Sequence, residues 1–422
     1  MDLIEIIGNK PLEGKIKISG SKNASLPIMI ASLLTKEKVE IDNIPNLSDV
    51  STLIDLMKSL GADIKLDQSL EFKRKISFTT KEILHSEASY DLVRKMRASF
   101  WVLAPLIVRY GEAKVSLPGG CAIGTRPVDL HLFALKKLGA KIKIKNGYIL
   151  AEAKQGLKGA IINFPFISVG ATENALLAAC KAKGKTVLKN CAIEPEIKDL
   201  IIFLNKLGSK IKFKGRTIII YENKLKSSNI SHEVIFDRIE LGTYMIACAL
   251  LVKKNIMIDK INPKIVENEI NVLKTLGVKI VKKKTSVIIK KNRKLKKINI
   301  TTKPYPGFPT DLQAQLMVLL TQVEGVSKIK ENIFENRFMH VPELKRMGAK
   351  IEIQNNSAFI SGPCSLTGAE VMATDLRASV SLVLAGLIAD NRTNINRIYH
   401  LDRGYQDLEK KLIKCKARIK RV

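Results

Sequence analysis

Residues 134–144 read ALKKLGAKIKI, a helix-like run that stops at a glycine and continues as alternating lysine and isoleucine. The pattern recurs along the chain as LMKSLGADIKL (56–66), FLNKLGSKIKF (203–213), VLKTLGVKIVK (272–282), ELKRMGAKIEI (343–353) and, in degenerate form, KLIKCKARIKR (411–421). The glycine positions lie 68 to 78 residues apart, and Lys416 occupies that position in the last copy. A regular internal period indicates a repeat architecture, so this repeat decides the fold.

Each copy predicts a helix that ends at a glycine with positive φ and is followed by a strand with alternating apolar and lysine residues. Another helix precedes each copy and leads into a short β-rich run, as SVGATENALLAAC (168–180) leads into TVLKN. The unit is therefore helix, strand, helix, strand, with a further strand between, over about 70 residues. It contains too much strand for a helical solenoid. Six units predict two similar α/β domains of three repeats each, divided near the polar stretch KLKSSNISHE (224–233).

The chain is strongly basic, with 71 lysines and arginines against 40 acidic residues and a formal net charge of +31. Such a charge suits nucleic acid, a membrane surface or small acidic substrates. Alternatively, the lysines only cover exposed strand faces, as in VKKKTSVIIKKNRKLKKINI (281–300). Aromatic residues make up 5% and do not interleave the lysine runs, which leaves base stacking with little support.

No apolar run approaches the roughly 18 residues of a membrane helix, and the opening MDLIEIIGNKPLEGK lacks a signal-peptide pattern. We therefore expect a cytoplasmic protein without membrane contact. The six cysteines are scattered without CxxC pairs and the five histidines are equally dispersed. This spacing argues against a disulfide framework and a zinc site, so no metal is implied.

Polar residues gather where the first helix of each unit begins. Serine, aspartate and asparagine there are ordinary N-caps, but an arginine opposes the helix dipole and calls for an anion. Arg97 in KMRAS and Arg377 in DLRAS have parallel contexts, and Arg126, Arg337 and Arg403 lie in later loops. Arginines converging from different repeats predict a cleft for a polyanionic ligand.

Cys121 lies among glycines in LPGGCAIGTRPVDL (117–130), whereas Cys180 and Cys248 have apolar neighbours typical of buried cysteines. A thiol near a helix start and Arg126 has a stabilised thiolate, which is the reactive form. The alternative is a surface thiol without a role.

With these residues assembled, the chain resembles the UDP-N-acetylglucosamine 1-carboxyvinyltransferase family from end to end. The resemblance rests on ten motifs in order: SGSKNASLP (19–27), YDLVRKMRAS (90–99), SLPGGCAIGTRPVDLH (116–131), SVGAT (168–172), EPEI (194–197), DRIELGT (237–243), FPTDLQAQ (308–315), FENRFMHVPELKRMGA (334–349), MATDLRAS (372–379) and RIYHLDRGY (397–405). It implies a two-domain enolpyruvyl transferase-like α/β fold with six βαβαββ-type repeats in two pseudo-threefold domains. We place these domains at 22–235 and at 1–21 with 236–422, with the active site in the cleft between them.

The resemblance also implies an activity. The family transfers the enolpyruvyl group of phosphoenolpyruvate to the 3′-hydroxyl of UDP-N-acetylglucosamine and releases phosphate, the first committed step of peptidoglycan synthesis. It requires no metal or organic cofactor and is the target of fosfomycin. The chemistry needs an acid for the methylene carbon and a base for the sugar hydroxyl. By position, Cys121 resembles the acid and Asp311 the base, with Asp375 assisting.

The binding residues carry over in the same way. Lys22, Arg126 and Arg403 resemble the phosphoenolpyruvate clamp, and Arg377 would hold the substrate carboxylate. Asn23 and Arg97 match positions that contact substrate. The nucleotide sugar would lie against Arg126, Pro127, Val128, Asp129, Leu130, Phe166, Ile167, Ser168 and Val169, with Asp311 and Ile333 at its sugar end. The family often has a basic residue where this chain has Phe166.

Two rival functions stay open. A 5-enolpyruvylshikimate-3-phosphate synthase shares the fold and reaction type, but its loop lacks the cysteine that PGGCAIGTRP contains here. A basic nucleic-acid-binding protein belongs to another class and is supported only by charge.

Overall fold

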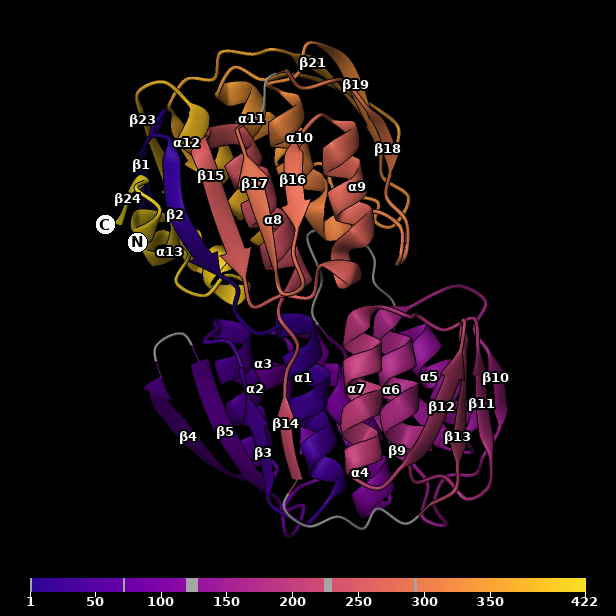
Figure 1. Cartoon of the computed structure of the whole chain (residues 1–422). Helices are drawn as coiled ribbons and strands as arrows, with labels where there is room; N and C mark the ends of the chain where they lie inside the picture. The colour runs from indigo at the N-terminus through magenta and orange to yellow at the C-terminus, as the bar shows by residue number, and fades with distance from the viewer. Residues whose placement is uncertain (1, 71–72, 119–127, 224–229, 292–293) are drawn as a thin grey trace. The chain divides into compact units, whose positions relative to one another are not determined.

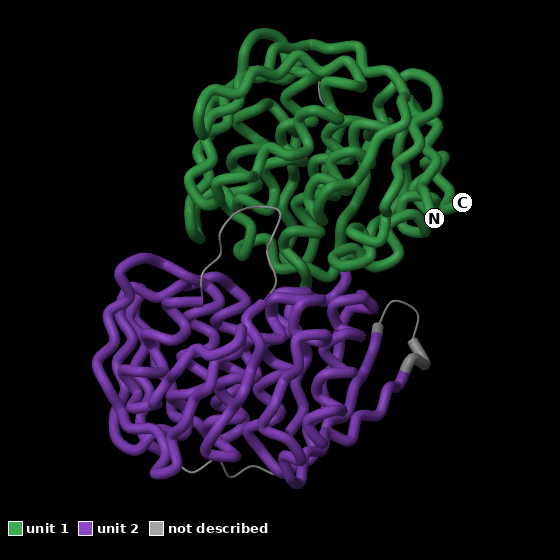
Figure 2. Tube along the Cα trace, turned by 180° about the vertical axis from the view of Figure 1, so that it is seen from behind, with its two compact units in different colours: residues 1–18, 121–125, 236–422 green, residues 19–120, 126–235 purple. Residues whose placement is uncertain are grey.

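A computed structural model of the chain describes residues 2–70, 73–118, 128–223, 230–291 and 294–422. The described chain folds into two compact units (Figure 2). Unit 1 contains residues 2–18 and 236–422, and unit 2 contains residues 19–118 and 128–235. Each unit has its own buried apolar core. The domain bounds expected from the sequence, and the cleft between the domains, stay predictions.

The strands of each unit form three four-stranded sheets within the described residues (Figure 1). In unit 2 the sheets are β14 (Ile230–Glu233), β3 (Val39–Asp42), β5 (Lys73–Thr79), β4 (Asp63–Leu70); β6 (Glu87–Ala88), β7 (Glu112–Ser116), β9 (Tyr148–Glu152), β8 (Lys141–Lys145); and β10 (Ile161–Asn163), β11 (Thr186–Lys189), β13 (Thr217–Tyr221), β12 (Lys210–Lys214). In unit 1 they are β2 (Leu12–Lys17), β15 (Val252–Asp259), β17 (Ser286–Lys290), β16 (Lys279–Lys282); β18 (Asn299–Thr301), β19 (Gly325–Lys330), β21 (Ser357–Gly362), β20 (Lys350–Gln354); and β22 (Glu370–Met372), β23 (Arg392–Asn396), β1 (Ile4–Ile7), β24 (Arg418–Arg421). Every sheet has one parallel pair followed by two antiparallel pairs, so the predicted repeat is confirmed.

Strands distant in sequence complete three of these sheets. In unit 1, β2 pairs in parallel with β15, with Lys15 opposite Met257. In unit 1, β1 lies between β23 and β24, with Ile4 opposite Ile395 on one side and Arg421 on the other. In unit 2, β14 pairs in parallel with β3, with Ile230 opposite Val39. The last repeat therefore obtains a central strand from the N-terminal segment, and the first repeat obtains its parallel strand from the end of the third.

The helices occupy matching positions in the repeats. Unit 2 has α1 (Lys22–Ala31), α2 (Ser48–Ser59), α3 (Tyr90–Val93), α4 (Leu103–Tyr110), α5 (Asp129–Lys137), α6 (Val169–Ala179) and α7 (Pro195–Lys206), with 3₁₀ helices η1 (Ser32–Leu34) and η2 (Arg97–Val102). Unit 1 has α8 (Arg238–Leu251), α9 (Glu267–Thr275), α10 (Gln313–Leu320), α11 (Val341–Arg346), α12 (Leu376–Ile388) and α13 (Leu408–Lys414), with 3₁₀ helices η3 (Pro263–Val266), η4 (Thr310–Leu312) and η5 (Ile398–Arg403). None of the described helices combines the length and apolar character that a membrane crossing needs.

The first helix of each repeat is central to its unit. In unit 1, α8, α10 and α12 pack against one another and are buried almost all round, as their apolar sequences require. Arg377 at the start of α12 contacts Asp311 just before α10, and Gln315 in the first turn of α10 contacts Thr243 on α8. The N-termini of the three helices therefore share one end of the unit. Polar residues at these N-termini are thereby brought together.

The glycines that mark the repeats adopt the predicted conformation. Gly61, Gly139, Gly208, Gly277 and Gly348 have φ between 96° and 103°. Lys416, in the glycine position of the last copy, has φ 73°. The chain reversal needs this left-handed residue even where the sequence supplies a side chain that disfavours it.

The strand after each marker lies at the edge of its sheet. In β8 the side chains of Lys141, Lys143 and Lys145 are exposed, and the lysines of β12 are exposed in the same way. Charged edge strands resist pairing with other chains. Much of the positive charge is therefore spread over separate sheet edges in both units, which supports the view that lysines cover exposed strands.

Candidate active site

Three predicted site residues, Cys121, Arg126 and Pro127, lie outside the described residues, and their roles stay predictions. The other predicted residues fall into two groups, one in each unit. Those of unit 1 are Asp311, Ile333, Asp375, Arg377 and Arg403. Those of unit 2 are Lys22, Asn23, Arg97, Val128, Asp129, Leu130, Phe166, Ile167, Ser168 and Val169.

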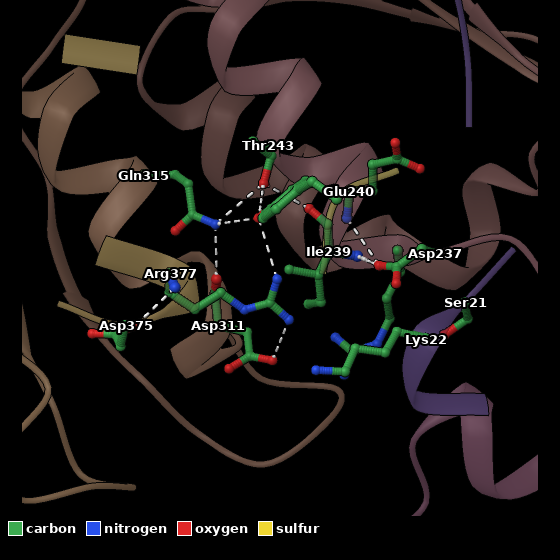
Figure 3. A network of polar contacts seen from close by, with 12 residues as sticks. Ser21, Lys22, Asp237, Ile239, Glu240, Thr243, Asp311, Gln315, Asp375 and Arg377 are labelled. Atoms are coloured by element: carbon green, nitrogen blue, oxygen red, sulfur yellow. Dashed lines mark hydrogen bonds and ion pairs between the residues drawn. The ribbon is translucent and has the colours of Figure 1, made fainter. Parts of the chain in front are cut away.

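In unit 1 the Asp311 carboxylate lies between two arginines, Arg377 and Arg337; Figure 3 shows its contact with Arg377. Its Oδ2 accepts a hydrogen bond from Arg377 Nη2 at 2.8 Å, and its Oδ1 accepts one from Arg337 Nη2 at 2.5 Å. The side chains of Arg377 and Arg337 are 8% and 5% exposed, whereas that of Asp311 is 26% exposed. The carboxylate therefore forms the solvent-facing part of a largely buried ion cluster.

The charges in this cluster shift one another's pKa. Burial raises the pKa of Asp311, but the positive charges of Arg377 and Arg337 outweigh it and hold the pKa well below its usual range. Burial lowers the pKa of Arg377, and the Asp311 carboxylate more than compensates, which raises it. Asp311 is an anion at any physiological pH in this arrangement. The anion that Arg377 needs at a helix start is thus supplied by the chain itself, where the sequence suggested a ligand.

A buried polar group lies directly behind the ion pair. The Tyr405 hydroxyl accepts a hydrogen bond from Arg377 Nη1 at 3.2 Å. It also lies 3.0 Å from Thr243 Oγ1 and 3.2 Å from Gln315 Nε2. Gln315 Nε2 donates in addition to the main-chain oxygen of Asp311 at 2.9 Å (Figure 3). We call Thr243, Gln315 and Tyr405 the polar hub; it joins α8, α10 and the segment between η5 and α13 behind Asp311 and Arg377.

Helix capping accounts for some of the predicted polar residues. Asp375 Oδ1 accepts hydrogen bonds from the main-chain nitrogens of Arg377 at 2.8 Å and Ala378 at 3.1 Å. Asp237 caps α8 and Ser168 caps α6 in the same manner. Asp311, in contrast, caps no helix, because the N-cap residue of η4 is Pro309. The capping interpretation is confirmed for Asp375, Asp237 and Ser168, and the proposed assistance of Asp375 in catalysis stays a prediction.

The loop that carries Ile333 is organised by Glu331, which is 3% exposed. Glu331 Oε1 accepts a hydrogen bond from the main-chain nitrogen of Ile333 at 2.7 Å. Its Oε2 accepts one from the hydroxyl of Thr310 at 2.9 Å, next to Asp311 in the chain. Ile333 and Thr310, the neighbour of Asp311, are thereby bound to one carboxylate. Arg403, at the end of η5, is half-buried.

In unit 2, Lys22 is the first residue of α1, and Ser21 caps the helix. Lys22 Nζ lies 2.7 Å from Asp49 Oδ2, near the start of α2, and both side chains are largely buried. Asn23 follows on α1, and half-buried Arg97 begins η2. The contact with Asp49 fixes the direction of the Lys22 side chain at this helix start, a position that suits a phosphate ligand.

The start of α6 has aromatic neighbours. A Cβ built on Gly170 would lie 3.2 Å from both Trp101 Nε1 and His131 Cε1, so a side chain here would require these two rings to shift. Ile167 and Val169 pack against the unit 2 core, while Phe166 is 56% exposed. At the start of α5, Val128 and Leu130 are buried and Asp129 is exposed. The described parts of both predicted nucleotide-sugar segments thus lie at helix starts.

Sequence reasoning missed several of these residues. Trp101, His131, Glu331 and the polar hub were not assigned to the site, and Arg337 was noted without a partner. All but Trp101 and Glu331 belong to the ten motifs. The signal available in the sequence was therefore a polar residue inside one of the ten motifs.

The described cysteines are buried, as predicted for Cys180 and Cys248. Burial raises the pKa of Cys180 and Cys191 to about 12 and that of Cys415 to about 11. Burial also raises the pKa of Cys248. These thiols are protonated and inaccessible at neutral pH. Within the described residues, no three His, Cys, Asp or Glu side chains gather where they could hold a metal ion.

A family model described as EPSP synthase (3-phosphoshikimate 1-carboxyvinyltransferase) matches residues 6–412. The chain belongs to the EPSP synthase family. Among its relatives, the UDP-N-acetylglucosamine 1-carboxyvinyltransferase of Pelagibacter ubique is 56% identical over 422 residues, which covers 100% of both chains. The Rickettsia felis protein of the same name is 54% identical over 423 residues, again with 100% of both chains covered. The predicted family resemblance is confirmed.

Solved structures of this family have the same fold. The enolpyruvyl transferase NikO from Streptomyces tendae matches with a TM-score of 0.91 at 26% identity and covers 100% of this chain and 99% of that chain. An EPSP synthase from Acinetobacter baumannii matches with a TM-score of 0.78 at 16% identity and covers 100% of both chains, which supports the fold alone. The predicted two-domain enolpyruvyl transferase-like fold is confirmed.

Proposed function

We propose that the chain transfers the enolpyruvyl group of phosphoenolpyruvate to the 3′-hydroxyl of UDP-N-acetylglucosamine and releases phosphate. The observation that carries this proposal is full-length identity of 56% to a relative with that name. The geometry adds a carboxylate placed between two arginines at a cluster of helix N-termini. This arrangement suits an anionic substrate and a proton transfer at the same place.

The reaction proceeds by addition and elimination. Cys121 donates a proton to the methylene carbon of phosphoenolpyruvate while the sugar oxygen bonds to its central carbon and Asp311 takes the hydroxyl proton. Loss of a proton from the new methyl group and departure of phosphate then restore the double bond. Lys22, Arg126 and Arg403 hold the phosphate and stabilise its charge as it leaves.

The ion cluster affects how Asp311 acts as a base. A carboxylate with a lowered pKa is a weak base, and Arg377 contributes to that lowering. In our proposal Arg377 also binds the carboxylate of phosphoenolpyruvate. When the substrate carboxylate binds, Arg377 interacts with two anions instead of one. Asp311 is then less stabilised by the positive charge of Arg377, so the pKa of Asp311 rises and it becomes a stronger base. Asp311 is then most basic in the complex that needs it.

The remaining predicted residues orient the acceptor. Asn23 and Arg97 contact substrate, and the nucleotide sugar lies along 126–130 and 166–169 with Ile333 at its sugar end. Asp375 assists catalysis from the N-cap position of α12. We place the reaction in the cytoplasm, as the first committed step of peptidoglycan synthesis, without a metal or organic cofactor.

A test of this proposal is phosphate release from phosphoenolpyruvate by the purified chain. We expect release with UDP-N-acetylglucosamine and none with shikimate 3-phosphate. Release with shikimate 3-phosphate alone would favour the 5-enolpyruvylshikimate-3-phosphate synthase alternative. The nucleic-acid alternative predicts tight binding that survives moderate salt, whereas incidental attraction to lysine edges is lost there.

A further inference from the structure

We infer that the Tyr405 hydroxyl is a positioning group that fixes the guanidinium of Arg377 toward Asp311 and toward an anionic substrate. The inference rests on the proposed function for its substrate, but the geometry is independent of it. Tyr405 is 3% exposed and Arg377 is 6% exposed. The guanidinium carbon lies 5.7 Å from the centre of the Tyr405 ring, and Nη1 donates to the hydroxyl.

The donor and the acceptor can be assigned for the hydrogen bonds of the Tyr405 hydroxyl in the polar hub. Thr243 Oγ1 lies 2.9 Å from the main-chain oxygen of Ile239, to which its proton is donated. The Thr243 oxygen is therefore an acceptor for Tyr405, whose own proton points toward it. The lone pairs of the Tyr405 oxygen are left for Arg377 Nη1 and Gln315 Nε2, both of which can only donate. The hydroxyl is thus held as an acceptor facing Arg377.

The same hub fixes the other member of the ion pair. Gln315 Nε2 donates to the main-chain oxygen of Asp311 as well as to the hub. Arg377 is set through its side chain by Tyr405, and Asp311 is set through its backbone by Gln315. Burial raises the pKa of Tyr405, so its proton stays in place at neutral pH.

The hub residues come from three of the motifs noted in the sequence. Thr243 ends DRIELGT, Gln315 ends FPTDLQAQ and Tyr405 ends RIYHLDRGY. None of the three has a place in the proposed chemistry, although Gln315 lies four residues from Asp311 and Tyr405 two residues from Arg403. Holding the ion pair from behind explains why these polar side chains occupy a buried position.

The test compares Tyr405→Phe with Tyr244→Phe. Tyr244 is 1% exposed and follows Thr243 on α8, and its hydroxyl has no hydrogen-bond partner in the part of the chain that the structure describes. Both substitutions remove one buried hydroxyl, so Tyr244→Phe is the control for a merely structural effect. Thr243→Val is a second variant, which removes the acceptor for the Tyr405 proton but leaves Tyr405 itself.

The first measurement does not depend on turnover. Phenylglyoxal modifies accessible arginines, and peptide mass spectrometry reports the rate at Arg377. We expect Arg377 to react about five-fold faster in Tyr405→Phe than in the wild type, because the guanidinium has lost an acceptor, with a smaller increase in Thr243→Val. Tyr244→Phe should react at the wild-type rate. Equal rates in Tyr405→Phe and Tyr244→Phe would overturn the inference.

The second measurement uses steady-state kinetics. We expect Tyr405→Phe to raise the KM for phosphoenolpyruvate about ten-fold while the KM for UDP-N-acetylglucosamine changes less than two-fold. A general loss of structure would raise both or lower only the melting temperature, and either result contradicts a positioning role. A wild type without transfer activity contradicts the proposed function instead, and the modification rates then still decide the inference.

Discussion

Arg377 Nη2 donates a hydrogen bond to Asp311 Oδ2 at 2.8 Å, which joins the second residue of α12 to the middle of η4. The two residues come from neighbouring repeats and meet because the central helices of unit 1 begin at the same end. Their contact turns a predicted base and a predicted substrate ligand into one electrostatic unit. Changes at either residue therefore affect both catalysis and stability.

Asp311→Asn should lower kcat by about 10² to 10⁴, the usual effect of losing a positioned base. It should also lower the free energy of unfolding by about 2 kcal/mol, because two largely buried arginines lose their carboxylate. Kinetics and urea denaturation measure the two effects. Glu324→Gln is the control, since Glu324 pairs with Lys294 at the exposed surface. Turnover within a few-fold of the wild type would exclude Asp311 as the base.

Glu173 predicts a pH dependence of stability. It is fully buried on α6 and has no hydrogen-bond partner among the described residues. Burial, with the charges of Glu196 and Glu194, raises its pKa well above the ordinary 4.5. Below pH 4.5 the Glu173 carboxyl is neutral in both the folded and the unfolded state. As the pH rises, the unfolded chain ionises first, so the folded state loses stability. Glu173→Gln should therefore melt at a higher temperature than the wild type at pH 8, with the difference shrinking toward pH 4.

Calorimetry across this range is the measurement, and Glu352→Gln, on the exposed edge of β20, is the control. A difference in melting temperature that is independent of pH would show that Glu173 does not ionise on unfolding. A lower melting temperature for Glu173→Gln at pH 8 would contradict the prediction directly.

The repeat markers predict opposite effects for two substitutions. Lys416→Gly should raise the free energy of unfolding by about 1 kcal/mol, because it removes the strain of a side chain at φ 73°. Gly139→Ala should lower the free energy of unfolding by about 1 kcal/mol, because Gly139 has φ 96°, which disfavours a side chain. A built Cβ has open space around it, so no clash adds to this effect. Denaturant titration of both variants tests the pair. A destabilised Lys416→Gly would mean that the lysine side chain contributes more than its backbone strain costs.

Fosfomycin should modify Cys121 alone among the six cysteines. The five described cysteines are buried, and burial raises the pKa of Cys180, Cys191, Cys248 and Cys415, so these thiols resist alkylation. Cys121→Asp should keep activity and resist the drug, because a carboxyl donates a proton but opens an epoxide poorly. Cys121→Ala should lose much of the activity. Peptide mass spectrometry with UDP-N-acetylglucosamine present is the measurement, and label on another cysteine would contradict it.

The repeat and its turns could be predicted from the sequence because the physical signals are local. A glycine after a helix and an alternating strand after the glycine need only neighbouring residues, and Gly61 to Gly348 all have the predicted positive φ. The pairing of Ile4 with Ile395 could not be predicted, since nothing in the sequence around Ile4 specifies a partner at the other end of the chain. Closure of a sheet by a distant strand is a property of the whole unit.

In the site, too, some residues could be predicted from the sequence and others could not. Arg377 stands out because a guanidinium at a helix start opposes the helix dipole. Asp311 stands out through the family resemblance. Thr243, Gln315 and Tyr405 do not, because each is an ordinary residue for a helix or loop. Only their meeting behind Arg377, within 3.2 Å of one another, makes them a hub.

The most direct test of the proposed function is a competition between acceptors in one reaction. The purified chain is mixed with phosphoenolpyruvate and equal amounts of UDP-N-acetylglucosamine and shikimate 3-phosphate, and mass spectrometry identifies which acceptor gains the enolpyruvyl group. We predict that only the nucleotide sugar is converted, with one phosphate released per product. Conversion of shikimate 3-phosphate, or phosphate release without an enolpyruvyl product, would contradict the account.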